Sequence, residues 1–218
     1  MAKLLGGIDE AGRGPVIGPL VVAGASIDAK SAHRLKRLGV RDSKTLTPKR
    51  REALYEEILL ASSRVASLMI QPREIDEVVT KGRKYRKLNY LEALYFAKVA
   101  DELGASEVIV DASDSSPKRF RDVIVENMKR KTRVFAAHKA DRDYTVVSAA
   151  SIIAKVERDR AIEKLKRKLG DFGSGYPSDP VTKNFFLEKM RKGEPLPDEV
   201  RRSWKTLGNL QQTLLAPL

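Results

Sequence analysis

The stretch GGIDEAGRGP (residues 6–15) decides how the chain begins to fold. Residues 3–9 predict a strand, and the apolar stretch GPLVVAGASI (18–27) predicts a second one. The Gly-Pro pair at 14–15 indicates a turn between them. We therefore expect a hairpin whose first strand ends on two adjacent acids, Asp9 and Glu10.

Strands and helices alternate after this hairpin. Thr47 and Pro48 are typical of a helix start, and apolar residues recur at helical spacing beyond them. Helices are expected over 48–63, 89–104, from Pro117, and over 144–170; strands are expected over 64–71, 107–113 and 132–138. This order predicts an α/β fold, a mixed sheet with helices packed on it.

The chain changes character after residue 170. A Gly/Pro-rich loop (171–180) precedes two expected short helices, 181–193 and 198–209, with no strand signal. We interpret 1–170 as the main domain and 171–218 as a C-terminal helical extension and tail.

The composition favours a nucleic-acid partner. Lys and Arg number 42 against 29 Asp and Glu, a net charge of +13, which suits a polyanion. The alternative is the solvated surface of a heat-adapted protein, in keeping with 33% charged residues and no Cys. The absence of an apolar run of eighteen residues or a signal peptide predicts a soluble, cytoplasmic protein with no membrane contact. Without Cys and with two His, any metal is expected on oxygen ligands.

Four acids stand at the ends of expected elements: Asp9, Glu10, Asp111 and Asp141. If the strands of Asp9 and Asp111 are parallel neighbours, their carboxylates meet at one edge of the sheet. Because successive strand residues point to opposite faces, Asp9 and Glu10 can share a site only if the strand breaks there. Converging carboxylates favour a hard divalent cation, Mg²⁺ or Mn²⁺. Each acid alone could equally cap a turn or a helix.

A set of motifs resembles one known family. In chain order they are DEAGRGP (9–15), DSK (42–44), VDAS (110–113), HKAD (138–141), AASIIAKVERD (149–159), GSGYPSDPVT (173–182) and RRSWKT (201–206). Together they resemble archaeal ribonuclease HII over nearly the whole length. The resemblance implies a ribonuclease H-like mixed five-stranded sheet flanked by helices.

The resemblance also implies roles for particular residues. Asp9, Glu10, Asp111 and Asp141 would form a catalytic quartet holding two Mg²⁺ or Mn²⁺ ions. The backbone of Gly12, Arg13 and Gly14 would contact the ribose 2′-hydroxyl, since glycine allows close approach. Substrate contacts are further implied for Tyr176, on the sugar beyond the ribonucleotide, and for Lys44, on a phosphate.

Ser151 and Lys155 stand four residues apart in the expected helix 144–170. This spacing puts both on one face, where a hydroxyl and an ammonium group can bind the same phosphate. The same residues also fit a helix that packs small side chains into the core.

The resemblance implies the activity of a type 2 ribonuclease H acting in DNA replication and repair. Its substrates would be RNA–DNA hybrids and duplex DNA with embedded ribonucleotides, cut to 5′-phosphate and 3′-hydroxyl ends. Two alternatives stay open: a nucleic-acid-binding module whose acids are structural, and a metal-dependent DNA nuclease such as a resolvase or an exonuclease. We expect a monomer. The tail QQTLLAPL (211–218) partly resembles sliding-clamp-binding peptides, with Gln211 and Leu214 at the expected spacing.

Overall fold

A computed structural model describes residues 3–41, 46–82 and 87–209. Its centre is a five-stranded sheet in the order β3-β2-β1-β4-β5. The strands are β1 (Leu4–Ala11), β2 (Leu20–Asp28), β3 (Arg64–Ile70), β4 (Glu107–Asp111) and β5 (Arg133–Ala137). β1, β2 and β3 pair antiparallel, whereas β4 runs parallel to β1 and to β5. The predicted hairpin and mixed sheet are both confirmed.

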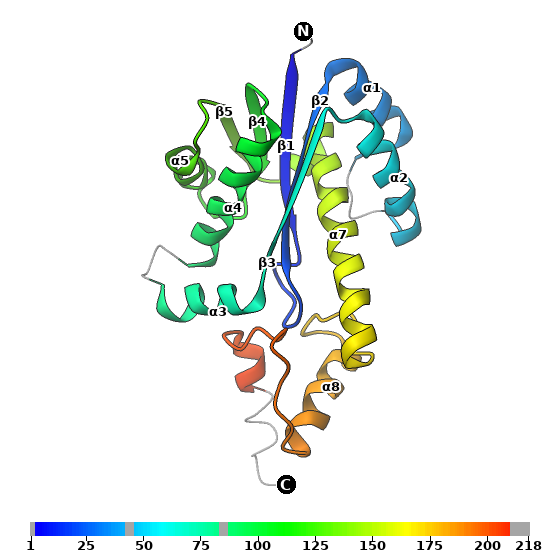
Figure 1. Ribbon diagram of the computed structural model, residues 1–218, viewed down its shortest axis with the longest axis vertical. Helices are drawn as coiled ribbons and strands as arrows, with labels where there is room; N and C mark the ends of the chain where they lie inside the picture. The colour runs from blue at the N-terminus through cyan, green and yellow to red at the C-terminus, as the bar shows by residue number, and fades with distance from the viewer. Residues whose placement is uncertain (1–2, 42–45, 83–86, 210–218) are drawn as a thin grey trace.

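Helices cover both faces of the sheet, because the strand residues alternate between two apolar cores. One face packs against α1 (Ala29–Leu38), α2 (Pro48–Ala61) and α7 (Thr145–Leu169). The opposite face packs against α3 (Pro72–Lys81), α4 (Leu88–Leu103) and α5 (Pro117–Asn127). Figure 1 shows these two layers on either side of β1. Asp9 and Glu10, as neighbours on β1, therefore point toward different helix layers.

Gly7 allows α7 to approach β1 closely. A Cβ atom on Gly7 would lie 2.2 Å from the backbone carbonyl of Val146, a distance that real Cβ atoms do not reach. The first turn of α7 therefore rests directly on β1. This contact brings the short helix α6 (Ala140–Asp143), which precedes α7, to the end of the central strands.

Besides the four-residue α6, two helices, α1 and α3, were not predicted. Both are short and bury few residues: Leu35 alone in α1, Pro72 and Ile75 in α3. α1 is defined by its ends, where Asp28 accepts a hydrogen bond from the Ser31 N–H and Gly39 closes the helix at φ 94°. The expected cap at Thr47 is confirmed, since its side chain accepts from the Arg50 N–H.

The C-terminal part contains α8 (Pro180–Arg191), close to the predicted span. The second helix predicted there is wrong over its first half, because only 205–209 of the described residues are helical. Residues 199–201 instead bond to the β1–β2 connection: Gly18 N–H to Glu199 O and Arg201 N–H to Val16 O, both 2.8 Å, with Ile17 and Val200 forming a bridge. These bonds compete with helix formation.

A third apolar core joins this C-terminal part to the rest. It combines residues from the β1–β2 connection and α7 with residues beyond 170: Val16, Ile17, Ile162, Phe172, Phe186, Val200 and Leu207. The C-terminal part thus packs directly beneath the turn that follows Asp9 and Glu10. Within the described ranges, no helix combines the length and apolar character needed to cross a membrane.

Candidate active site

Asp9 and Asp111 emerge side by side from parallel strands. Ile8 of β1 pairs with Val110 of β4, so the next residue on each strand turns to the same face of the sheet. That face is the one covered by α7. The predicted meeting of the two carboxylates follows from this register.

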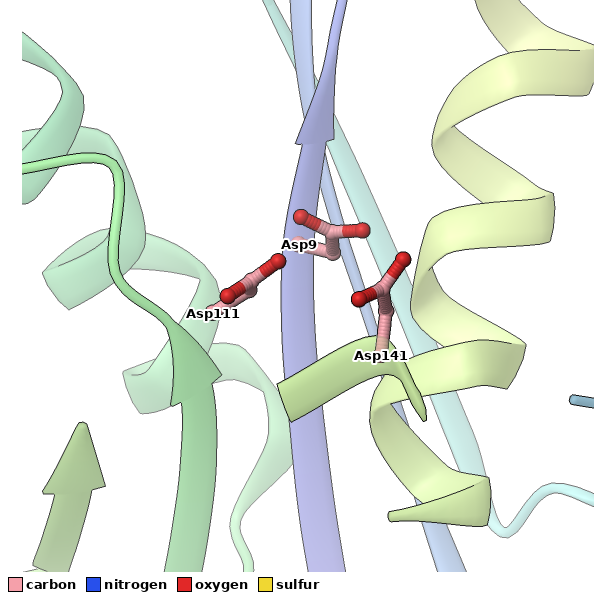
Figure 2. A group of neighbouring side chains, drawn as sticks. All are labelled: Asp9, Asp111 and Asp141. Atoms are coloured by element: carbon pink, nitrogen blue, oxygen red, sulfur yellow. The ribbon is translucent and has the colours of Figure 1, made fainter. Parts of the chain in front are cut away.

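Asp141 reaches the same point from α6. The Asp111 side chain accepts a hydrogen bond of 3.2 Å from the Ala140 N–H, which ties the start of α6 to the end of β4. Carboxylate oxygens of Asp9, Asp111 and Asp141 lie within 4.8 Å of one another. Figure 2 shows the three side chains converging from β1, β4 and α6.

Glu10 is not part of this group of three. β1 continues to Ala11 without the break that a shared direction would need, and Glu10 pairs regularly with Val22 of β2. Its side chain therefore turns toward α4, where Glu92 lies. Burial, followed by repulsion from Asp9 and Glu92, raises the pKa of Glu10 well above its usual value. Its Oε2 atom is buried without a hydrogen-bond partner among the described residues.

The charges fit a hard cation. Burial, with repulsion from Asp111, raises the pKa of Asp9 to about 6, although Lys155 opposes the shift. Carboxylates that destabilise one another in this way are stabilised by a divalent ion, and oxygen-only ligands suit Mg²⁺ or Mn²⁺. Asp9, Asp111 and Asp141 would hold such an ion, and the unpartnered oxygen of Glu10 offers a further ligand.

The carboxylates open into a cleft of about 480 Å³. It is lined by Asp9, Glu10, Ala11, Gly12, Arg13, Gly14, Arg51, Asp111, Asp141, Lys155, Arg158, Asp159 and Tyr176. The wall thus combines acids with the cationic side chains of Arg51, Lys155 and Arg158. Such a mixture suits a phosphodiester beside metal ions.

The turn Gly12–Arg13–Gly14 borders this cleft. Gly12 has φ 89°, a conformation that favours glycine. Tyr176 packs against Gly14, its Cε1 lying 3.3 Å from where a Cβ would stand, and is 40% exposed. The turn and the tyrosine therefore form one continuous surface.

The Arg13 guanidinium points inward. It forms a 3.0 Å ion pair with Glu92 and donates to the Ser113 carbonyl at 2.8 Å and to Asn89 Oδ1. Its backbone, rather than its charge, is thus turned to the cleft.

Ser151 and Lys155 lie together on α7 beside Asp9. Lys155 Nζ donates to Ser151 Oγ at 2.6 Å, and both side chains lower the pKa of Asp9 against the effect of burial. Lys44 lies outside the described residues.

Comparison with known proteins identifies the family. The family model described as ribonuclease HII matches residues 6–207. A ribonuclease HII from Pyrococcus horikoshii is 47% identical over 208 residues, which cover 94% of this chain and 92% of that protein. The chain belongs to the ribonuclease HII family.

Solved structures agree with this assignment. The crystal structure of ribonuclease H2 from Pyrococcus horikoshii superposes with a TM-score of 0.87 at 45% identity, covering 98% of this chain and all of that one. The PCNA:RNase HII complex from Archaeoglobus fulgidus gives 0.85 at 45% identity, covering 95% and 97%. The chain is accordingly an enzyme, a type 2 ribonuclease H with the ribonuclease H-like fold.

Arg51, Arg158 and Asp159, which line the cleft of this ribonuclease HII site, were missed in the sequence. Two residues behind the cleft were missed as well: Glu92 and Arg201. Both are fully buried, and burial raises the pKa of Glu92 to about 7 while Arg13 opposes the shift. Glu92 was not recognised because it stands in the apolar stretch NYLEALYF (89–96), and an isolated acid in such a helix is normally exposed to solvent. Arg201 stood within the RRSWKT motif, which gave no indication of its burial.

Proposed function

We propose that this chain is an endoribonuclease that cuts the RNA strand of RNA–DNA hybrids and also cuts at single ribonucleotides embedded in duplex DNA. The observation that carries this proposal is the approach of Asp9, Asp111 and Asp141 within 4.8 Å, in a cleft bordered by a glycine turn. Membership in the ribonuclease HII family supports the substrate class. The products would carry 5′-phosphate and 3′-hydroxyl ends.

The four acids would act as metal ligands. Two Mg²⁺ or Mn²⁺ ions bound there would supply an activated water and stabilise charge on the leaving 3′-oxygen. Asp9, Asp111 and Asp141 hold their carboxylates on the α7 face, and Glu10 contributes from the α4 face. Ser151 and Lys155 would orient Asp9 and contact the phosphate beside it. Lys44 is proposed as a further phosphate contact.

Recognition of ribose would be the task of the Gly12–Arg13–Gly14 backbone. The 2′-hydroxyl both donates and accepts hydrogen bonds and distinguishes RNA from DNA at one position. Tyr176, adjacent to Gly14, would pack on the neighbouring sugar. This arrangement favours cutting next to a ribonucleotide over cutting plain DNA.

The test is cleavage of duplex DNA that contains one ribonucleotide, with Mg²⁺ and with chelator. We expect a single cut with metal, none with chelator, and none in the all-DNA duplex. A binding module would bind equally in both conditions without cutting. A resolvase or other DNA nuclease would cut the all-DNA duplex.

A sliding clamp is the proposed protein partner. The solved structure of the PCNA:RNase HII complex from Archaeoglobus fulgidus and the tail sequence QQTLLAPL (211–218) both support it. The tail lies outside the described residues. A clamp pull-down should succeed with the full chain and fail with a chain ending before Gln211; undiminished capture rejects the tail as the contact. We further propose a monomer that acts in the cytoplasm, in DNA replication and repair.

A further inference from the structure

Arg201 is the largest fully buried side chain of the described residues. It lies behind the Gly12–Arg13–Gly14 turn and does not line the cleft. Its guanidinium donates three hydrogen bonds to backbone carbonyls, those of Gly12 at 2.7 Å, Arg13 at 3.0 Å and Gly18 at 3.0 Å. It forms no ion pair with any acid in the described ranges.

A buried cation without a paired carboxylate is costly to the fold. Burial, followed by repulsion from Arg158, lowers the pKa of Arg201 to about 10. An apolar side chain of similar volume would fill this space at less cost. The charge of Glu92 and the Trp204 ring, 5.1 Å from the guanidinium, also stabilise the cation. Its hydrogen bonds among the described residues, however, all go to the three carbonyls, and two of these belong to the turn.

The carbonyl bonds fix where the N–H groups of the turn point. None of the described peptide bonds is cis, and in a trans peptide the C=O and N–H point in opposite directions. The carbonyls of Gly12 and Arg13 point back to Arg201, so the N–H groups of Arg13 and Gly14 point to the opposite side, where the cleft lies. Neither N–H makes a hydrogen bond within the described part of the chain.

Arg201 also polarises these peptide units. A cation on a carbonyl oxygen strengthens the N–H of the same peptide as a donor, because hydrogen bonds in a chain reinforce one another. Two aligned donors of this kind suit an oxygen atom with lone pairs. We propose that Arg201 is a positioning residue that aims the Arg13 and Gly14 N–H groups at the ribose 2′-oxygen and thereby determines selectivity for ribose; this inference rests on the proposed function.

The test compares two duplexes in chelator, one with a single ribonucleotide and one of DNA alone. Wild type should bind the first more tightly. Arg201→Lys keeps the positive charge but loses the planar array of guanidinium N–H donors, and Arg201→Gln removes the charge. In both, we expect this preference to fall about tenfold, a change of about 1.4 kcal/mol, with the Kd for all-DNA unchanged. The matched control is Arg202→Lys, because Arg202 is exposed and, among the residues that the structure describes, bonds only to the C-terminal segment and to Asp76.

Far-UV circular dichroism and the urea transition report whether the variants keep their fold. Trp204 emission is unsuitable for this purpose, because the Arg201 guanidinium lies 5.1 Å from the centroid of the Trp204 ring and each variant changes the surroundings of that ring directly. A retained preference in variants with wild-type circular dichroism and a cooperative urea transition overturns the inference. A wild type that shows neither preference nor cleavage with Mg²⁺ rejects the proposed function instead.

If neither variant folds, the inference is tested on the wild-type protein by NMR titration. The amide resonances of Arg13 and Gly14 should shift on titration with the ribonucleotide duplex and stay nearly unchanged with all-DNA. Equal shifts with both duplexes, or none, overturn the inference.

Discussion

Asp9 opposes folding when no cation is bound beside it. Its pKa rises from 3.8 to about 6, chiefly through burial. Between pH 3.8 and 6 the folded protein therefore keeps a proton that the unfolded chain has released. The stabilisation that this proton provides is complete below pH 3.8 and is lost as the pH rises through 6. At pH 8 in chelator, Asp9→Asn should raise the free energy of unfolding by about 1–3 kcal/mol, measured by urea denaturation. A less stable variant would contradict this.

Bound Mg²⁺ should remove the stability advantage that Asp9→Asn has over wild type in chelator. A cation binds the carboxylate form, so protons compete with it, and binding weakens below the pKa of Asp9. We expect Mg²⁺ to raise the Tm of wild type by several degrees at pH 8 and by much less at pH 5. Asp9→Asn should show little change at either pH. Asp198→Asn, altered at a fully exposed side chain, should respond like wild type.

Single residues differed in how well the sequence predicted them. Asp9 and Asp111 could be placed because each directly follows the apolar run of an expected strand, and parallel pairing brings such positions together. Glu10 was harder, because its direction depends on whether the strand breaks, and β1 does not. Arg201 could not be recognised, since a buried cation satisfied by carbonyls has no sequence pattern of its own.

The packing of α7 on β1 depends on Gly7. A methyl group there would overlap the Val146 backbone, which cannot move aside as a flexible side chain can. Gly7→Ala should therefore lower the free energy of unfolding by about 3 kcal/mol or more. Cleavage should also fall, because α6 and α7 carry Asp141 and Lys155.

Gly208→Ala is the matched control for Gly7→Ala. Nothing lies within 4 Å of a Cβ at Gly208, and the residue is in a helical turn, where alanine is favoured. Urea denaturation should show no loss of stability in this control. Equal midpoints for the two variants would show that close contact of α7 with β1 is not required.

Elements with a strong internal pattern were predicted well. The five strands and α7 follow from apolar runs and helical spacing, which tertiary contacts reinforce. The start of the last predicted helix was wrong because residues 199–201 bond to Val16 and Gly18 instead. That preference depends on a segment about 180 residues away in the chain, so no local window contains it.

The whole molecule should unfold as one unit, although we divided the chain at residue 170. The third core joins Val16, Ile17 and Ile162 to Phe172 and Phe186, so the C-terminal part has little apolar core of its own. Trp204 fluorescence reports this part, and far-UV circular dichroism reports the sheet and helices. The two urea transitions should coincide. An earlier Trp204 transition would establish a separately folding extension.

The net charge of +13 has two explanations, a nucleic-acid surface and a heat-adapted exterior, and salt distinguishes them. If cations contact phosphates, each contact releases a counterion, and log Kd rises linearly with log salt concentration. Four or five contacts would give a slope of about 4 for the hybrid. Asp111→Asn should show the same slope and a similar Kd while cutting nothing, because it changes a metal ligand and leaves the cationic surface intact. A slope near zero would favour the heat-adapted exterior, and residual cutting by Asp111→Asn would remove that carboxylate from the proposed metal site.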